Sequence, residues 1–128
     1  MSTIEEAAVS LVKADAAVGA LAGDDIFPKR MPPGQTTDCI VYQVISAPEL
    51  RVAEYVRPRI QFSCWGTTYA KAVALANAVR ACFFDQHLTV LGVHLRCWVD
   101  NIMDGEDDEA TGRYSRIVDV RFVYRNPT

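Results

Sequence analysis

Residues 114–124 read YSRIVDVRFVY, the clearest strand pattern in the chain. Side chains of a β-strand point alternately to its two faces. Every second residue from Tyr114 to Tyr124 is apolar or aromatic, except Arg116. Polar side chains, including Asp119 and Arg121, share the other face. This alternation predicts a β-strand with one buried side and one exposed side.

Three earlier stretches also have the character of strands. Residues 56–65 and 94–103 alternate between apolar and polar side chains, which predicts two more half-buried strands. Residues 39–46 (CIVYQVIS) are apolar on both faces, as in a central strand covered on two sides. The apolar run 88–93 allows one short additional strand. Pro58 cannot donate a ladder hydrogen bond, so it lies at a sheet edge or the strand begins after it.

Two helices are predicted from caps and apolar periodicity. The first begins at Ser2 or Thr3, each followed three residues later by a glutamate, which is the spacing of a capping box. Asp15 caps a further turn that ends before Gly23. The second helix begins after Thr67 or Thr68 and runs to about residue 84, with an apolar stripe on one side.

The predicted fold is α+β: a mostly antiparallel sheet of about four strands with both helices packed on one face, in the order α-β-β-α-β-β. Residues 24–38 and 47–55 are predicted loops, and the acidic run that begins at Asp104 connects two strands. The 128 residues are enough for one domain, residues 1–128, with its own core.

Charge and composition exclude several functions. The 13 basic and 16 acidic residues give a net charge of −3, which argues against non-specific nucleic-acid binding. Residues 1–6 lack the features of a secretory signal, and no apolar run is long enough to span a membrane. We therefore expect a protein made in the cytoplasm, without a membrane partner. The four cysteines show no CxxC spacing and are expected to be reduced and buried.

Catalytic and metal chemistry finds little support in the sequence. His87 and His94 have no ligand spacing, and Cys64 falls on the apolar face of its strand, without a nucleophile elbow. The acidic run does not match a calcium-binding loop. We expect no catalytic residue, no cofactor, no metal and no enzymatic activity.

The exposed face of the predicted sheet collects positive charge. Its cationic side chains are Arg57, Arg59, His94, Arg96, Arg121 and Arg125. One interpretation is a solvated or subunit-contact surface, where these arginines pair with carboxylates such as Asp100 and Asp119. The other is a surface that faces nucleic-acid phosphates.

The chain resembles the tail completion, or tail terminator, proteins of long-tailed bacteriophages and related virus-like particles. The segments that carry the resemblance, over nearly the whole chain, are 4–7, 14–24, 26–28, 40–43, 59–66, 69–72, 75–76, 114–116 and 119–122. These residues are core, cap and turn residues. Their order and spacing, rather than a single motif, make the match.

The resemblance implies a structural role in a virion, at the junction of tail and head. Similar subunits form a ring, usually a hexamer, on the last ring of the tail tube. The implied partners are other copies of the chain, the tail tube protein and the head-tail connector, or stopper, protein. DNA passes through the lumen of such a ring without specific binding. A head-to-tail cyclic interface provides this geometry, because it closes and leaves two different end faces.

Nine residues are candidates for contacts between subunits or with the lumen: Arg57, Arg59, Arg116, Arg121, Arg125, Glu106, Asp107, Asp108 and Glu109. Four of the arginines, Arg57, Arg59, Arg121 and Arg125, could pair across subunits with Asp107, Asp108 or Glu109. The acidic run could also lie at a ring end or beside the channel, where it would repel DNA. Arg116 lies on an apolar face and needs a partner or an edge position.

Two alternatives remain open from the sequence. One is a small cytosolic ligand-binding domain or enzyme of unknown substrate, with a pocket between the sheet and the loop at residues 28–38. The other is a nucleic-acid-binding accessory protein that stacks bases on Trp65 or Trp98.

Overall fold

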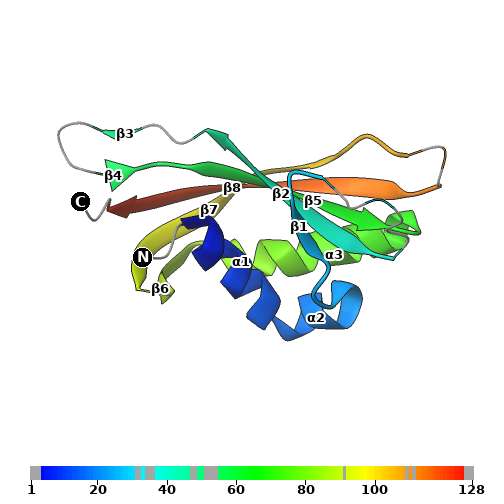
Figure 1. Ribbon diagram of the computed structural model, residues 1–128, viewed down its shortest axis with the longest axis horizontal. Helices are drawn as coiled ribbons and strands as arrows, with labels where there is room; N and C mark the ends of the chain where they lie inside the picture. The colour runs from blue at the N-terminus through cyan, green and yellow to red at the C-terminus, as the bar shows by residue number, and fades with distance from the viewer. Residues whose placement is uncertain are drawn as a thin grey trace.

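A computed structural model describes residues 4–30, 33, 37–46, 49–50, 55–90, 92–108, 110 and 112–125. Three helices lie on one face of a mixed β-sheet, and the other face carries no helix (Figure 1). The elements are α1 (Ile4–Ala14), α2 (Ala16–Ala22), β1 (Ile26–Pro28), β2 (Cys39–Ser46), β3 (Glu49–Leu50), β4 (Tyr55–Val56), β5 (Arg59–Gly66), α3 (Tyr69–Phe83), β6 (Gln86–Val90), β7 (Val93–Asp104) and β8 (Tyr114–Arg125).

The strand β8 organises the sheet. It pairs antiparallel with β7 along one side, and with β5 and β4 along the other. Beyond β5 the sheet continues through β2 to β1, which is parallel to β2, while β6 pairs with β7 at the opposite edge. The stretch with the cleanest alternation is therefore a central strand of the sheet.

Pro58 lies between two strand segments, and β5 begins directly after it, which confirms one of the two alternatives predicted for this proline. The segments β4 and β5 both pair with β8 and are separated by residues 57–58. Pro58 has no N–H to donate, but its carbonyl accepts a hydrogen bond from the Phe122 amide at 2.9 Å. The proline is thus buried inside the sheet without an unpaired amide of its own.

Caps explain where the helices begin and end. The Asp15 side chain accepts a hydrogen bond from the Val18 amide at 3.0 Å, and its extended backbone separates α2 from α1. Thr68 caps α3 by accepting from the Lys71 amide at 3.2 Å. Gly23 ends α2 with a positive φ of 60°, which glycine adopts at little cost.

The core lies between the helices and one face of the sheet. The rings of Phe62 and Phe83 are stacked with centroids 5.1 Å apart, and Phe83 meets Phe122 edge-on at 5.5 Å. These rings join β5, α3 and β8, and none of the three side chains is exposed. Burying one such side chain contributes about 1.5–3 kcal/mol, so this contact is central to the packing.

The α+β class, the single helical layer and the short strand before residue 94 are confirmed. The expectation of two helices was wrong, because the extended backbone at Asp15 makes the predicted further turn a separate helix. The expectation of about four strands was also wrong, because short segments extend the sheet. The segment β1 lies in the predicted loop 24–38, and β3 with part of β4 lies in the predicted loop 47–55.

Candidate assembly surfaces

The sheet face without helices presents side chains in rows that run across several strands. One row is polar and joins Gln43, Gln61, Asp119 and Asn101 on β2, β5, β8 and β7. The neighbouring row joins Arg59, Arg121 and Trp98 on β5, β8 and β7. We call this side of the sheet the open face. It brings arginines, carboxylates and amides together on a broad surface.

Positive charge on the open face is partly neutralised within the chain. Arg121 Nε lies 3.3 Å from Asp100 Oδ2, and both side chains are about 40% exposed. Asp119 sits in the adjacent row and is 6% exposed. Two buried atoms of this face, Arg59 Nε and Asp119 Oδ1, have no hydrogen-bond partner among the described residues. Such groups are costly to bury, so they mark a surface that a partner could complete.

The acidic turn, of which the structure describes residues 105–108, 110 and 112, joins β7 to β8. The strand ends that it joins lie at one end of the molecule's long axis (Figure 1). Its base is fixed by hydrogen bonds from the Gly105 amide to the Ser115 carbonyl at 3.0 Å and from Ser115 Oγ to the Glu106 carbonyl at 2.8 Å. Asp108 and Arg113 exchange both backbone hydrogen bonds, at 2.9 and 3.1 Å. These hydrogen bonds hold the described backbone on both sides of the exposed Glu106 and Asp107 side chains.

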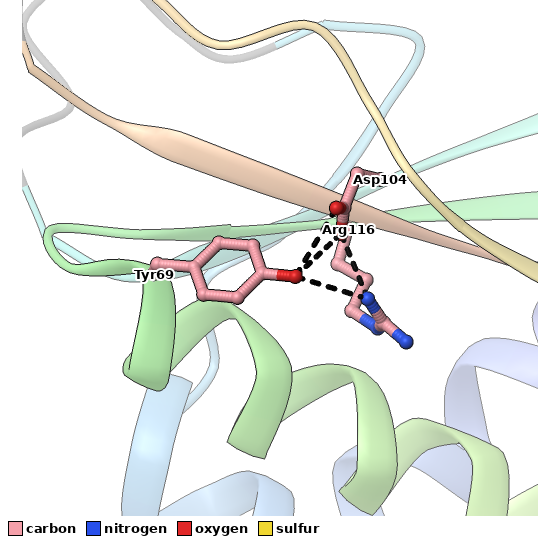
Figure 2. A network of polar contacts seen from close by, with 3 residues as sticks. All are labelled: Tyr69, Asp104 and Arg116. Carbon is pink, nitrogen blue, oxygen red and sulfur yellow. Dashed lines mark hydrogen bonds and ion pairs between the residues drawn. The ribbon is translucent and has the colours of Figure 1, made fainter.

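A polar network lies beside this turn, on the helix side of the sheet (Figure 2). Arg116 Nη1 donates to Asp104 Oδ1 at 2.7 Å. The Tyr69 hydroxyl, at the start of α3, is 3.1 Å from both carboxylate oxygens of Asp104 and accepts from Arg116 Nη1 at 3.4 Å. The sequence expectation that Arg116 needs a partner is met within the chain, by Asp104.

The basic cleft lies at the opposite end of the sheet. It has a volume of about 590 Å³ and is lined by Arg57, His87, His94, Arg96, Trp98 and Tyr124, together with Leu95 and Val123. Arg96 Nη2 lies 4.0 Å from Asp85 Oδ1, and both side chains are largely exposed. His94 Nδ1 is 2.6 Å from Thr89 Oγ1. The cleft therefore combines a cationic rim with apolar walls.

Arg113 is a structural residue that the sequence did not reveal. It is 4% exposed, and its Nη2 donates to the Thr37 carbonyl and lies 3.7 Å from Cys39 Sγ. Its guanidinium carbon is 6.0 Å from the centroid of the Trp65 ring. Arg113 thus ties the segment before β2 to the start of β8. The sequence contains one indication of this role, which is the position of Arg113 directly before the last predicted strand. The acidic run beside it suggested a solvent-exposed connection instead.

The candidate contact residues from the sequence lie on different surfaces of the structure. Arg59 and Arg121 are Cα partners on the open face, Arg57 lines the basic cleft, and Arg116 is held in the polar network. Glu106 and Asp107 are exposed on the acidic turn, and Asp108 is half-buried. Glu109 and the side chain of Arg125 lie outside the described residues. In a single chain the basic cleft and the acidic turn do not meet.

All four cysteines are free thiols. Burial raises the pKa of each one, to about 11 for Cys97 and about 12 for Cys82. Within the described ranges, no group of three histidine, cysteine, aspartate or glutamate side chains is placed to hold a metal ion. No described helix is both long and apolar enough to cross a membrane.

Comparisons with solved structures show the fold in other proteins. A chain from a structure titled "Virion of native gene transfer agent (GTA) particle" superposes with a TM-score of 0.74 at 17% identity, covering 96% of this chain and 95% of that chain. A second chain, whose title gives no function, has a TM-score of 0.62 at 13% identity, covering 100% of this chain and 99% of that chain. Among curated proteins there is no significant match.

A family model gives the assignment that low-identity structural matches cannot. The model described as "Tail completion protein gp17" matches residues 6–125. The match includes every helix and strand of the structure, apart from the first two residues of α1. The chain therefore belongs to the tail completion protein gp17 family.

Proposed function

We propose that this chain is a structural virion protein that forms a ring, of six copies, on the end of a tail tube. The ring ends elongation of the tube and joins the tail to the head connector. DNA passes through its lumen without specific binding. The observation that carries this proposal is the family match over residues 6–125, supported by a shared fold with a chain of a gene transfer agent particle.

The open face supports a role in contacts between proteins. A sheet covered by helices on one side leaves a wide second surface (Figure 1). Arg59 Nε and Asp119 Oδ1 are desolvated on that surface without a partner among the described residues. Burying these atoms without hydrogen bonds costs the isolated chain folding free energy. A neighbouring protein that supplied the hydrogen bonds would remove this desolvation cost.

The charges of the open face favour protein contact over DNA binding. Arg121 is paired with Asp100, and Asp119 lies on the same strand as Arg121. Non-specific DNA binding needs several cations free to contact phosphates. With carboxylates interspersed among the arginines, this face fits a subunit or tube surface better than a phosphate-binding one.

The experiment is to measure the mass of the purified protein by light scattering across a concentration series, with negative-stain images of the same samples. The expected result is a ring with sixfold symmetry and a central hole, formed either in solution or after addition of purified tail tubes. A protein that stays monomeric with and without tubes, and leaves tube growth unchanged, would refute the proposal.

A further inference from the structure

We propose that the basic cleft of one subunit receives the acidic turn of a second copy of the chain, in a head-to-tail contact that repeats around the ring. This inference rests on the proposed function. It names the residues that would hold neighbouring subunits together. Opposite charges, the position of the two surfaces and the hydrogen bonds at the base of the turn support this contact.

Charge complementarity is the first support. The cleft carries the guanidinium groups of Arg57 and Arg96, with Asp85 as the acidic neighbour of Arg96. The turn carries Glu106 and Asp107, whose exposed carboxylates have no ion pair among the described residues. A carboxylate that enters the cleft would meet cations at its rim, and such pairing sets the orientation and specificity of an interface.

The position of the two surfaces requires two copies. The acidic turn follows the end of β7, whereas the cleft is lined by residues near the start of β7 and the end of β8. These two ends of the paired strands are far apart along the long axis (Figure 1). Arg96 and Glu106 are ten residues apart along β7 and its turn, which is roughly 30 Å of extended chain. One chain cannot join its own ends across this distance. A contact between unlike surfaces of identical copies is heterologous, and repeated copies then form a ring when the rotation closes.

Hydrogen bonds at the base of the turn favour its insertion. The base is held by the Gly105 and Ser115 hydrogen bonds, and the Asp108 carboxylate accepts from the Ala110 amide at 3.1 Å. Backbone that is already held by hydrogen bonds loses less conformational freedom on binding than unconstrained backbone. The cleft also offers apolar surface from Trp98 and Tyr124 beside its cations, which would bury the stems of the acidic side chains.

Charge reversal provides the test, read as oligomer mass against concentration. One variant carries Arg57→Glu and Arg96→Glu, and the other carries Glu106→Lys and Asp107→Lys. Each variant alone is expected to need at least roughly tenfold more protein to assemble, because like charges then meet at every contact. An equimolar mixture should recover assembly, because each altered surface then finds an opposite charge. A chain with all four substitutions should recover it as well.

Controls separate this contact from general charge effects and from folding. Lys13→Glu with Asp24→Lys alters two exposed positions away from both surfaces and should assemble like the unaltered chain. Circular dichroism and the thermal midpoint confirm that each variant folds. Recovery in the mixture cannot arise from variants that have failed to fold.

Four outcomes would overturn the contact. Variants that form rings at the normal concentration would refute it and leave the proposed function intact. Variants that assemble normally but change DNA transit or head joining would place the acidic turn at the channel or a ring end. Loss of duplex-DNA binding in the Arg57 and Arg96 variant, with assembly unchanged, would assign the cleft to DNA.

The unaltered chain provides the remaining outcome. If it never assembles, even on tubes, the proposed function fails together with the contact.

Discussion

Arg116 and Asp104 are Cα partners on neighbouring strands, and Arg116 Nη1 donates to Asp104 Oδ1 at 2.7 Å. This pair explains how a charged residue occupies the apolar face of β8. The Arg116 side chain is 26% exposed and Asp104 is 55% exposed, so the pair lies at the boundary between core and solvent. Tyr69 adds a hydrogen bond to the same carboxylate and joins the start of α3 to the sheet (Figure 2).

Replacing Asp104 with asparagine should destabilise the fold. The substitution keeps an acceptor for the Tyr69 hydroxyl but removes the charge that faces Arg116, whose Nε is already buried without a partner among the described residues. The expected loss is about 1 kcal/mol of unfolding free energy, above the usual value for a fully exposed pair. Urea unfolding at neutral pH measures it.

The exposed pair of Arg96 and Asp85 provides the matched control. Its atoms are 4.0 Å apart and its side chains are 65% and 72% exposed. Asp85→Asn should therefore change the unfolding free energy by only a few tenths of a kcal/mol. Asparagine also tolerates the positive φ of 44° at this position. Equal effects of the two substitutions would contradict the structural role of the polar network.

Gly105→Ala should destabilise the protein, because the base of the acidic turn has no room for a side chain. A Cβ atom there would lie 2.4 Å from Ser115 Oγ and 3.1 Å from Ile117 Cδ1. Ser115 would have to move and give up its hydrogen bond to the Glu106 carbonyl. The expected cost is about 1–3 kcal/mol, measured as a shift in the urea midpoint.

Gly19→Ala should have the opposite effect. Gly19 lies inside α2, and a Cβ built there meets no atom within 4 Å. Alanine in a helix interior is more stable than glycine by about 0.5–1 kcal/mol. If Gly19→Ala destabilised the protein by as much as Gly105→Ala, crowding at Gly105 would not be the cause.

The long strands and the caps were predictable because local chemistry determines them. Alternation located β5, β7 and β8, and the position of Thr68 located the start of α3. The shortest strands, β1, β3 and β4, were not predicted as separate strands. The three residues of β1 and the two of β4 are strands because β2 and β8 offer them hydrogen bonds, and that information is tertiary. The helix break at Asp15 was visible as a cap, but not as the end of α1.

The candidate surfaces were predictable only in part. Alternation placed Arg59 and Arg121 on one sheet face, which the structure confirms by pairing them across β5 and β8. Their charge balance depends on the ion pair between Arg121 and Asp100, which forms beside an irregularity in the register of β7 and β8. A register shift of this kind leaves little trace in the sequence. Alternation placed Arg57, His94 and Arg96 on one face, but it did not predict the cleft that they line, because the lining residues come from separate strands.

The buried thiols should make stability fall at alkaline pH. Burial holds the pKa of Cys97 at about 11, above the ordinary thiol value of 9.0. Above pH 9 the thiol in the unfolded chain loses its proton while the folded chain keeps it, so the unfolded state binds fewer protons. The stabilisation is therefore complete below pH 9 and is lost between pH 9 and 11. The expected slope is at most about 1.4 kcal/mol per pH unit for this thiol.

Urea unfolding under reducing conditions from pH 8 to 10 measures this slope. Cys97→Ala, which removes the titrating group and leaves lysine and tyrosine titrations in place, should reduce the slope. It should lower stability most at pH 8, where the thiol of the unaltered chain is protonated in both states. An unchanged slope in this variant would show that the Cys97 thiol does not supply the pH dependence.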